Sequence, residues 1–457
     1  MATPCRYRHS PCRAGERGGP NSTTMKTFDS AVTPLQEIVR ALRAPATGAL
    51  EEQRLVADIV AGVRDGGDEA LVKFARQYDS PLITQRSLFV STQEIEAANA
   101  KVDKEFLSAL ETASERIAAF HRRQLAGSWS FEEDGILLGQ RFTPIERVAC
   151  CVPSRAAPLP SSVLMTVVPA RVAGAGEVIV MCPPKQDTGE VNPHILAAAR
   201  MAGADRVLRV GGAHGVAALA FGTESVPKVH KIVGPGNVFV TLAKRMVFGI
   251  VGIDSLAGPS EIVVLADFSA DPALVAAELL SQAEHSRDAV AVAVSDSVSL
   301  LAAVETQIQE QLPGLERSQT ARVSLDENGA LVRVVNLEQG IEFVNLFAPE
   351  HLQLAVSEPK KAADEVRNAG AIFLGQTTPE AFGDYIAGPS HVLPTGGTAL
   401  FSSPLSVLDF LKCSSLLMCS RESLSALAPA AVALARVEGL TAHARAVAAA
   451  AGMGDQG

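Results

Sequence analysis

Short runs of β-branched and other apolar residues alternate with longer alanine- and leucine-rich stretches over most of the chain after Met25. This alternation is typical of strand–helix–strand units, which assemble into parallel sheets. The runs predicted to be strands include residues 178–181, 207–210, 231–233, 262–265, 289–294, 343–346 and 371–374. Since each lies beside a glycine or proline turn or a helix-forming stretch, the pattern predicts an α/β fold.

Length and charge narrow the class of protein. The 457 residues would fill about three domains of ordinary size. The net charge of -10 is spread along the sequence, which favours solubility and offers no basic surface to nucleic acid. No apolar run reaches the roughly 18 residues that a membrane-spanning helix needs. We therefore expect a soluble protein with neither nucleic acid nor membrane as a partner.

The cysteines and the N-terminal segment bear on the compartment. The seven cysteines show no C-x-x-C spacing, which argues against a disulfide framework or a thiolate zinc site and favours the cytoplasm. The first 24 residues are rich in Arg, Pro and Gly and lack the apolar core of a secretory signal. Residues 1–25 are predicted to be a disordered extension or a misassigned start, with a transit peptide as the alternative.

Four polar clusters stand out in the C-terminal half, at residues 282–285, 349–351, 383–385 and 438–443. Asp271 and Pro272 can start a helix that carries Gln282 and His285 on one face. A structural histidine beside a hydrogen-bonded glutamine is the plain alternative for that pair. Adding Asp384 and His443 gives an all-nitrogen-and-oxygen set that suits zinc, so the clusters indicate a metal site; the pattern alone does not assemble it.

The cluster at Pro349, Glu350 and His351 is predicted to begin a helix, with proline in the first turn. The positive end of the helix dipole would keep His351 neutral and able to accept a proton. Adjacent helical residues point in different directions, so Glu350 could serve a separate step. A capping carboxylate beside a surface histidine is the alternative interpretation.

Five motifs in one order carry a family resemblance. They are V-G-P-G-N (233–237), A-G-P-S-E (257–261), S-Q-A-E-H (281–285), F-A-P-E-H-L (347–352) and H-V-L-P-T (391–395). From about residue 28 to about residue 450 the chain resembles the histidinol dehydrogenases. The resemblance implies two Rossmann-like parallel-sheet domains, one inserted in the other, with helical arms at both ends. The implied division is an N-terminal arm at 26–49, a first domain at 50–149 and 261–405, an inserted domain at 150–260 and a C-terminal arm at 406–457.

The resemblance also implies an activity, the zinc-dependent, NAD-linked four-electron oxidation of L-histidinol through histidinal to L-histidine. It implies that His351 takes protons and that Glu350 activates water. The implied zinc ligands are Gln282, His285, Asp384 and His443. In the family the matching C-terminal histidine comes from the partner subunit, so we expect a homodimer with shared active sites.

Further substrate contacts follow from the same resemblance, at Ser260, His391 and Glu438, beside the catalytic pair and the four metal ligands. Histidinol carries an ammonium group, so the carboxylate of Glu438 has a natural charge partner. Ser260 follows Gly258 and Pro259, and a serine in that place can also be turn chemistry alone.

The nucleotide site is the part where the chain departs from the family. No G-x-G-x-x-G fingerprint is present, and NAD is implied only by the resemblance, through Asn237, His214 and Cys151. The family pattern G-x-Y-V-P-G-G reads A-C-C-V-P-S-R at residues 149–155, and His214 stands where glutamine is usual. We expect these changes to weaken NAD binding or alter its pose, unless Arg155 pairs with a phosphate.

Two alternatives to histidinol oxidation stay open at this point. One is a related dehydrogenase of another small polar alcohol, such as sulfopropanediol. The other is a paralogue that keeps metal and ligand binding without dehydrogenase activity. The complete acid, base and metal set favours an oxidoreductase, whereas the altered nucleotide segment favours the paralogue.

Overall fold

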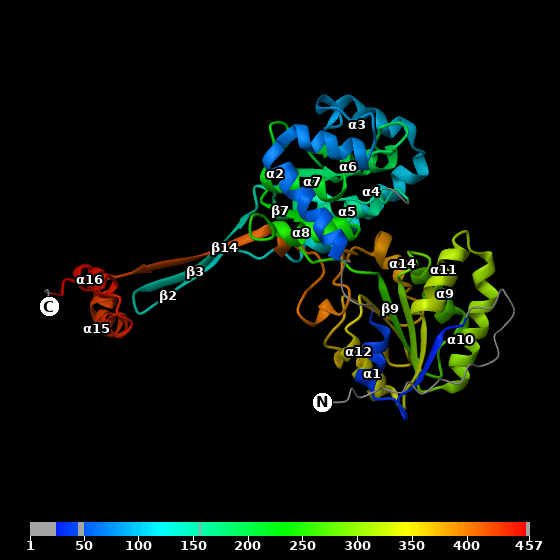
Figure 1. Cartoon of the computed structure of the whole chain (residues 1–457). Coiled ribbons are helices and arrows are strands. Elements are labelled where there is room, and N and C mark those ends of the chain that lie inside the picture. The colour runs from blue at the N-terminus through cyan, green and yellow to red at the C-terminus, as the bar shows by residue number, and fades with distance from the viewer. Residues whose placement is uncertain (1–23, 44–49, 155–156, 454–457) are drawn as a thin grey trace, which may run out of the picture.

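The computed structural model describes residues 24–43, 50–154 and 157–453, which form two lobes and a long projecting arm (Figure 1). The expected extension at residues 1–25 lies outside the described residues, apart from its last two. Each lobe is built on a parallel sheet. The expected α/β fold is therefore confirmed.

The first lobe contains a six-stranded sheet in the order β1-β11-β10-β9-β12-β13. Its strands are β1 (Lys26–Asp29), β9 (Glu261–Ala266), β10 (Val290–Ser295), β11 (Ala330–Arg333), β12 (His351–Ala355) and β13 (Ala371–Leu374). Every residue of β9, β10 and β12 is buried, as a parallel sheet covered on both faces requires.

Helices cover both faces of that sheet. One face packs against α9 (Pro272–Ala283), α10 (Val298–Gln311) and α11 (Ser318–Asn328). The other packs against α1 (Leu35–Leu42), α12 (Leu337–Phe347) and α13 (Pro359–Asp364). Alternate residues of β9 serve the two cores: Ile262 and Val264 face the first group of helices, and Val263 and Leu265 face the second.

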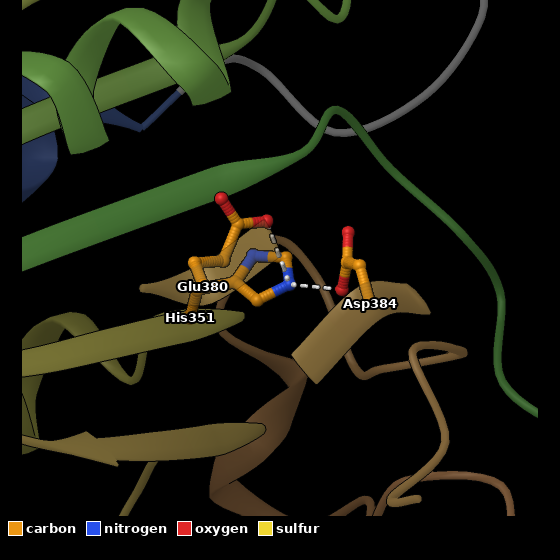
Figure 2. Close-up of side chains that lie close together, drawn as sticks. All are labelled: His351, Glu380 and Asp384. Atoms are coloured by element: carbon orange, nitrogen blue, oxygen red, sulfur yellow. Dashed lines mark ion pairs between the residues drawn. The ribbon is translucent and has the colours of Figure 1, made fainter. Parts of the chain in front are cut away.

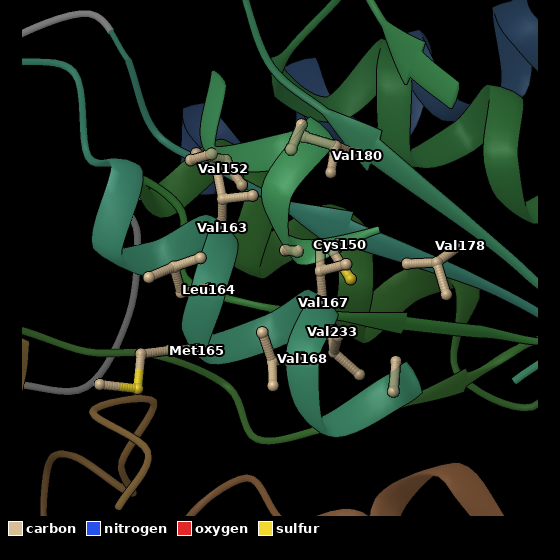
Figure 3. Close-up of a cluster of buried hydrophobic side chains, with 14 of the residues drawn as sticks. Cys150, Val152, Val163, Leu164, Met165, Val167, Val168, Val178, Val180 and Val233 are labelled. Atoms are coloured by element: carbon tan, nitrogen blue, oxygen red, sulfur yellow. The ribbon is translucent and has the colours of Figure 1, made fainter. Parts of the chain in front are cut away.

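The second lobe contains a five-stranded sheet in the order β6-β5-β4-β7-β8. Its strands are β4 (Arg147–Cys151), β5 (Glu177–Met181), β6 (Arg206–Leu208), β7 (Lys231–Val233) and β8 (Gly252–Ile253). Helices α4 (Lys104–Arg122), α5 (Pro160–Ala173) and α6 (Pro193–Ala202) pack on one face, where Cys150 and Val178 lie among apolar side chains of α5 (Figure 3). Helices α2 (Leu50–Tyr78), α7 (Gly212–Phe221) and α8 (Val238–Val247) pack on the other.

The chain enters the six-stranded sheet with β1, leaves to build the second lobe and returns with β9, which confirms the expected insertion. The expected borders differ from this packing. Helices α2, α3 (Thr92–Ala98) and α4 contact α5–α8 of the second lobe. Residues 50–122 therefore belong with the inserted lobe, because their apolar faces are covered there.

The arm is a three-stranded antiparallel ribbon that ends in two helices (Figure 1). It contains β2 (Trp129–Glu133), β3 (Ile136–Pro144), β14 (Leu411–Cys419), α15 (Arg421–Val437) and α16 (Thr441–Ala450). The expectation of helical arms at both ends is only partly right, because each arm also contains a strand. Strand β1 joins the six-stranded sheet, and β14 pairs with β3 over nine residues. Those hydrogen bonds join segments about 270 residues apart, so the local pattern does not reveal them.

One predicted strand is wrong. Residues 343–346 lie inside α12, which Asn336 caps by accepting a hydrogen bond from the Gln339 main-chain nitrogen. A short apolar run fits a buried helix as well as a buried strand. The predicted strands 231–233 and 371–374 match β7 and β13 residue for residue. Among the described helices, none combines the length and the apolar character that crossing a bilayer demands.

Candidate active site

Two buried ionisable residues begin neighbouring central strands of the six-stranded sheet. Glu261 begins β9 and His351 begins β12, and the two strands are direct neighbours. The expectation of a helix at Pro349–His351 is wrong, because α12 ends at Phe347 and Ala348 turns the chain with φ 47° before it extends into β12. His351 is therefore not at the N-terminus of a helix, where the expected dipole would act.

The His351 ring is fixed by one main-chain bond. Its Nδ1 lies 3.1 Å from the Glu261 carbonyl oxygen, and a carbonyl can only accept, so Nδ1 carries the proton. Its Nε2 faces Glu380 Oε1 at 3.5 Å and Asp384 Oδ1 at 3.7 Å (Figure 2). The nitrogen that can take a proton is thus directed between two carboxylates.

Burial and charge act in opposite directions on His351. Burial alone would lower its pKa, but the carboxylates of Glu350, Glu380 and Asp384 raise it to about 10. This is opposite to the expectation of a neutral ring held by a helix dipole. A divalent cation bound at Asp384 would offset that carboxylate's charge and bring the pKa of His351 down.

Glu350 is the second group of the predicted catalytic pair. Its side chain is buried, its Oε2 accepts a hydrogen bond from the Glu261 main-chain N–H at 2.8 Å, and the same oxygen lies 3.7 Å from His351 Nδ1. Burial raises the pKa of Glu350 to about 8. The carboxyl group can therefore exchange a proton near neutral pH, as a general base for water must.

Gln282 and His285 lie together at the end of α9, which begins as predicted with Asp271 as N-cap and Pro272 at the first position. Gln282 Nε2 donates to His285 Nδ1 over 2.9 Å, and Gln282 Oε1 is buried with no hydrogen-bond partner among the described residues. Burial lowers the pKa of His285 in spite of the charge of Asp384. A neutral imidazole and an unpartnered amide oxygen are donors that a zinc ion can use, so these residues fit the implied metal.

A carboxylate that the sequence reasoning missed lies in the same place. Glu380 is 1% exposed, and neither of its carboxylate oxygens has a hydrogen-bond partner within the described chain. It belongs to α14 (Glu380–Phe382), and Asp384 follows in a π-helical turn (Gly383–Ala387). The i, i+4 spacing of the two acids could have signalled it. Ligand atoms of His351, Glu380 and Asp384 all lie within 4.8 Å of one another, so Asp384 is common to two possible donor sets.

His391 and Ser260 border the catalytic pair. His391 Nδ1 donates to the Asp384 main-chain oxygen at 3.0 Å, and Ser162 Oγ lies 3.3 Å from His391 Nε2. Burial lowers the pKa of His391, which keeps its ring neutral. Ser260 and His391 line a cavity of about 230 Å³ together with Glu350. The fold thus brings both predicted substrate contacts to the cavity that Glu350 lines.

Two predicted residues lie elsewhere in the single chain. Glu438 is the C-cap of α15 and His443 lies in α16, both at the tip of the arm that projects away from the two lobes (Figure 1). Within one copy they do not reach Gln282, His285 or Asp384.

The predicted nucleotide contacts meet in one cavity of about 340 Å³ in the second lobe, where Cys151, His214 and Asn237 are among the lining residues. His214 Nε2 donates to Asp79 Oδ2 at 2.7 Å, so that nitrogen is already engaged. Asn237 caps α8 by accepting from the Val240 main-chain nitrogen. Ser154 also lines the cavity, whereas Arg155 lies outside the described residues.

Comparison with known proteins decides the family. The sequence profile described as histidinol dehydrogenase matches residues 43–450. The histidinol dehydrogenase of Syntrophotalea carbinolica is 50% identical over 396 residues, which cover 86% of this chain and 91% of the relative. That of Pseudomonas aeruginosa is 50% identical over 392 residues, covering 85% and 89%.

The chain belongs to the histidinol dehydrogenase family. The crystal structure of histidinol dehydrogenase from Elizabethkingia anophelis agrees, with a TM-score of 0.88 and 34% identity over 93% of this chain and 98% of that one. The family, the fold and a dehydrogenase activity, as the motifs predicted, are thereby confirmed.

Proposed function

We propose that this chain oxidises L-histidinol through histidinal to L-histidine, with NAD as the hydride acceptor and one zinc ion in each site. One observation carries the proposal. A buried His351 with a fixed tautomer lies beside the buried Glu350, and Glu350 lines a cavity that extends to the glycine loop of the second lobe (residues 234–237). This arrangement occurs in a chain that is half identical to histidinol dehydrogenases over most of its length.

The two residues of the pair have distinct tasks. His351 Nε2 removes the proton from the substrate hydroxyl, because Nδ1–H stays bonded to the Glu261 carbonyl. Glu350 removes a proton from the water that adds to the aldehyde carbon before the second oxidation. Its fixed bond to the Glu261 N–H holds the carboxylate beside the same cavity. Two oxidations can therefore use one site without exchange of the substrate.

Gln282, His285 and Asp384 would hold the zinc ion, with His443 of the partner subunit as the fourth ligand. The unpartnered Gln282 oxygen and the depressed pKa of His285 support the first two ligands. When bound, the zinc supplies a Lewis acid toward polar atoms of the substrate. The partner subunit's Glu438 would pair with the substrate ammonium.

The arm supports a shared site. Its apolar side chains are unusually exposed for a single copy: Phe131 is 48% exposed, Leu417 71%, Met418 62%, Leu434 68% and Val437 88%. Such a patch marks an interface, and the site lacks its fourth predicted ligand without a second copy. We infer a homodimer in which each arm reaches the other subunit's active site.

The dimer is tested by complementation. His351→Ala and His443→Ala proteins are each inactive on this account, and exchange of subunits between them should restore part of the activity, because a mixed dimer contains one intact site. Mixing His351→Ala with itself is the matched control. A fully active monomer in solution would contradict the shared site.

The activity itself is tested with zinc-loaded protein. NADH formation is followed with L-histidinol, with sulfopropanediol and with a panel of other small alcohols. The proposal requires L-histidinol to have the highest kcat/KM. Turnover of another alcohol in its place would support the related-dehydrogenase alternative, and no turnover of any would support a paralogue without dehydrogenase activity.

A further inference from the structure

A buried ion pair that the catalytic scheme does not use lies under the glycine loop of the second lobe. The side chains of Lys244 and Asp254 are only 3% and 4% exposed and contact each other directly. Lys244 Nζ also donates to the Gly234 carbonyl at 3.0 Å and to the Ser255 carbonyl at 3.1 Å. The ammonium group is thus fully engaged, with three acceptors in the described chain.

Both main-chain groups of Gly234 are held by this pair. Its carbonyl accepts from Lys244, and its N–H donates to Asp254 Oδ2 at 2.6 Å. Gly234 has φ 100°, and a Cβ atom there would lie 2.5 Å from the Cys151 carbonyl oxygen. The position therefore requires glycine, and the ion pair secures the turn at the point where β7 leaves the sheet.

The fixed turn separates the two cavities. Residues 235–237 line both the 340 Å³ cavity of the second lobe and the 230 Å³ cavity beside Glu350. Asp254 and Ser255 belong to the connection that leads from β8 to β9 and so to Glu261. Thr241 Oγ1 adds a second link from α8 to this connection, donating to the Ala257 carbonyl at 3.2 Å.

We propose that Lys244 and Asp254 are a positioning pair for the nucleotide. This inference rests on the proposed function, because it assumes that NAD occupies the larger cavity. The N-terminal end of a helix favours an anionic group such as a pyrophosphate, and α8 begins directly after this loop. The pair sets the loop against the connection to β9 and thereby sets the distance from the nucleotide to Glu350.

Stability alone does not require a charged pair here. Replacing a buried ion pair by uncharged side chains of similar volume is often neutral or stabilising, whereas removing one partner is strongly destabilising. The double variant Lys244→Met/Asp254→Asn is therefore the primary test. Its methionine fills the lysine's space, and its asparagine keeps an acceptor for the Gly234 N–H.

Calorimetric titration with NAD is the measurement. The double variant should bind NAD roughly tenfold more weakly, because the loop is no longer held in one place. L-Histidinol binding to the zinc-loaded, NAD-free protein should stay within about twofold, and at saturating NAD the kcat should fall less than kcat/KM for NAD. Thr241→Val removes the second link to this connection without leaving a buried charge; it should give a smaller loss of NAD affinity, and it serves if the double variant does not fold.

Asp68→Asn is the matched control. Asp68 is also a buried acid with several hydrogen bonds, to Gln85, Thr223 and Ser225, but it lines neither cavity. It should lower thermal stability and leave NAD affinity unchanged. If the wild type binds NAD and the folded variants bind it equally well, the positioning role is wrong and the cofactor proposal still stands. A wild type that binds no NAD would overturn the cofactor proposal and this inference together.

Discussion

The two parallel sheets place their candidate sites at opposite ends of their strands. In the five-stranded sheet the cavity lies past the carboxyl ends of β4 and β7, beside Cys151 and Gly234, which is where α/β sheets usually bind ligands. In the six-stranded sheet the predicted catalytic residues lie at the amino ends of the strands, where β9 begins at Glu261 and β12 begins at His351. The same architecture therefore carries two unlike sites.

A single carboxylate links the loops at the carboxyl ends of β9 and β12 in the six-stranded sheet. Asp267, just after β9, accepts hydrogen bonds from the main chain and hydroxyl of Ser269 and from those of Ser357, just after β12. The two loops are thus held together at the ends of the strands opposite to Glu261 and His351.

The two sites also differ in charge. At the amino ends of β9 and β12, His351 is buried among three carboxylates. Burial raises the pKa values of two of these, Glu350 and Glu380, to about 8 and about 7. The 340 Å³ cavity of the second lobe offers mainly glycine main chain, apolar side chains and the engaged pair of His214 and Asp79. Substitutions should therefore separate chemistry from nucleotide binding.

The largest effect is expected at His351. His351→Ala should lower turnover by roughly 10²–10⁴-fold, the usual contribution of a positioned base, with zinc content and NAD affinity unchanged. Gln353→Ala, two residues along the same buried strand, is the control and should keep most of the activity. A near-wild-type rate in His351→Ala would move the base to another residue.

The metal ligands come next, and Glu380 sharpens their assignment. Asp384→Asn and His285→Ala should reduce bound zinc by roughly tenfold or more, measured by elemental analysis after dialysis. Glu380→Gln should retain zinc if Gln282 and His285 complete the site. Loss of zinc in Glu380→Gln but not in His285→Ala would mean that His351, Glu380 and Asp384 bind the metal instead.

The water-adding step should depend on pH through Glu350. Because burial raises its pKa to about 8, the active carboxylate form increases as pH rises, by about tenfold per unit below that value, and levels off above it. The oxidation of histidinal between pH 6 and 10 is the measurement. Glu350→Gln should be slow and should lose the rise that levels off near pH 8, and an equal pH profile in both proteins would exclude Glu350 as the base.

The smallest effect is expected at His214. Glutamine can also donate to Asp79, so His214→Gln should change the Kd for NAD by less than about threefold. Asn237→Ala is the sharper comparison, because it removes the cap of α8 at the cavity and should weaken NAD binding more. A large loss in His214→Gln would mean that the histidine itself contacts the nucleotide.

The sequence predicts the buried strands better than it predicts the geometry of the site. Apolar runs predict β7 and β13 because strands covered on both faces contain little else, but the same signal misplaces residues 343–346 of α12. The polar clusters include His351 and Asp384, yet these two side chains meet only because the fold brings together residues 33 positions apart in the sequence. Glu380 is missed, because it lies outside the polar clusters and its spacing to Asp384 does not show that it is buried.

The most direct test of the account is the ratio of NADH to L-histidine formed by the zinc-loaded wild type from a limiting amount of L-histidinol. If both oxidations occur in the cavity that extends from Glu350 to residues 234–237 of the second lobe, two NADH appear for each L-histidine, and no free histidinal accumulates. One NADH per histidinol with release of the aldehyde, or no NADH at all, would contradict the account.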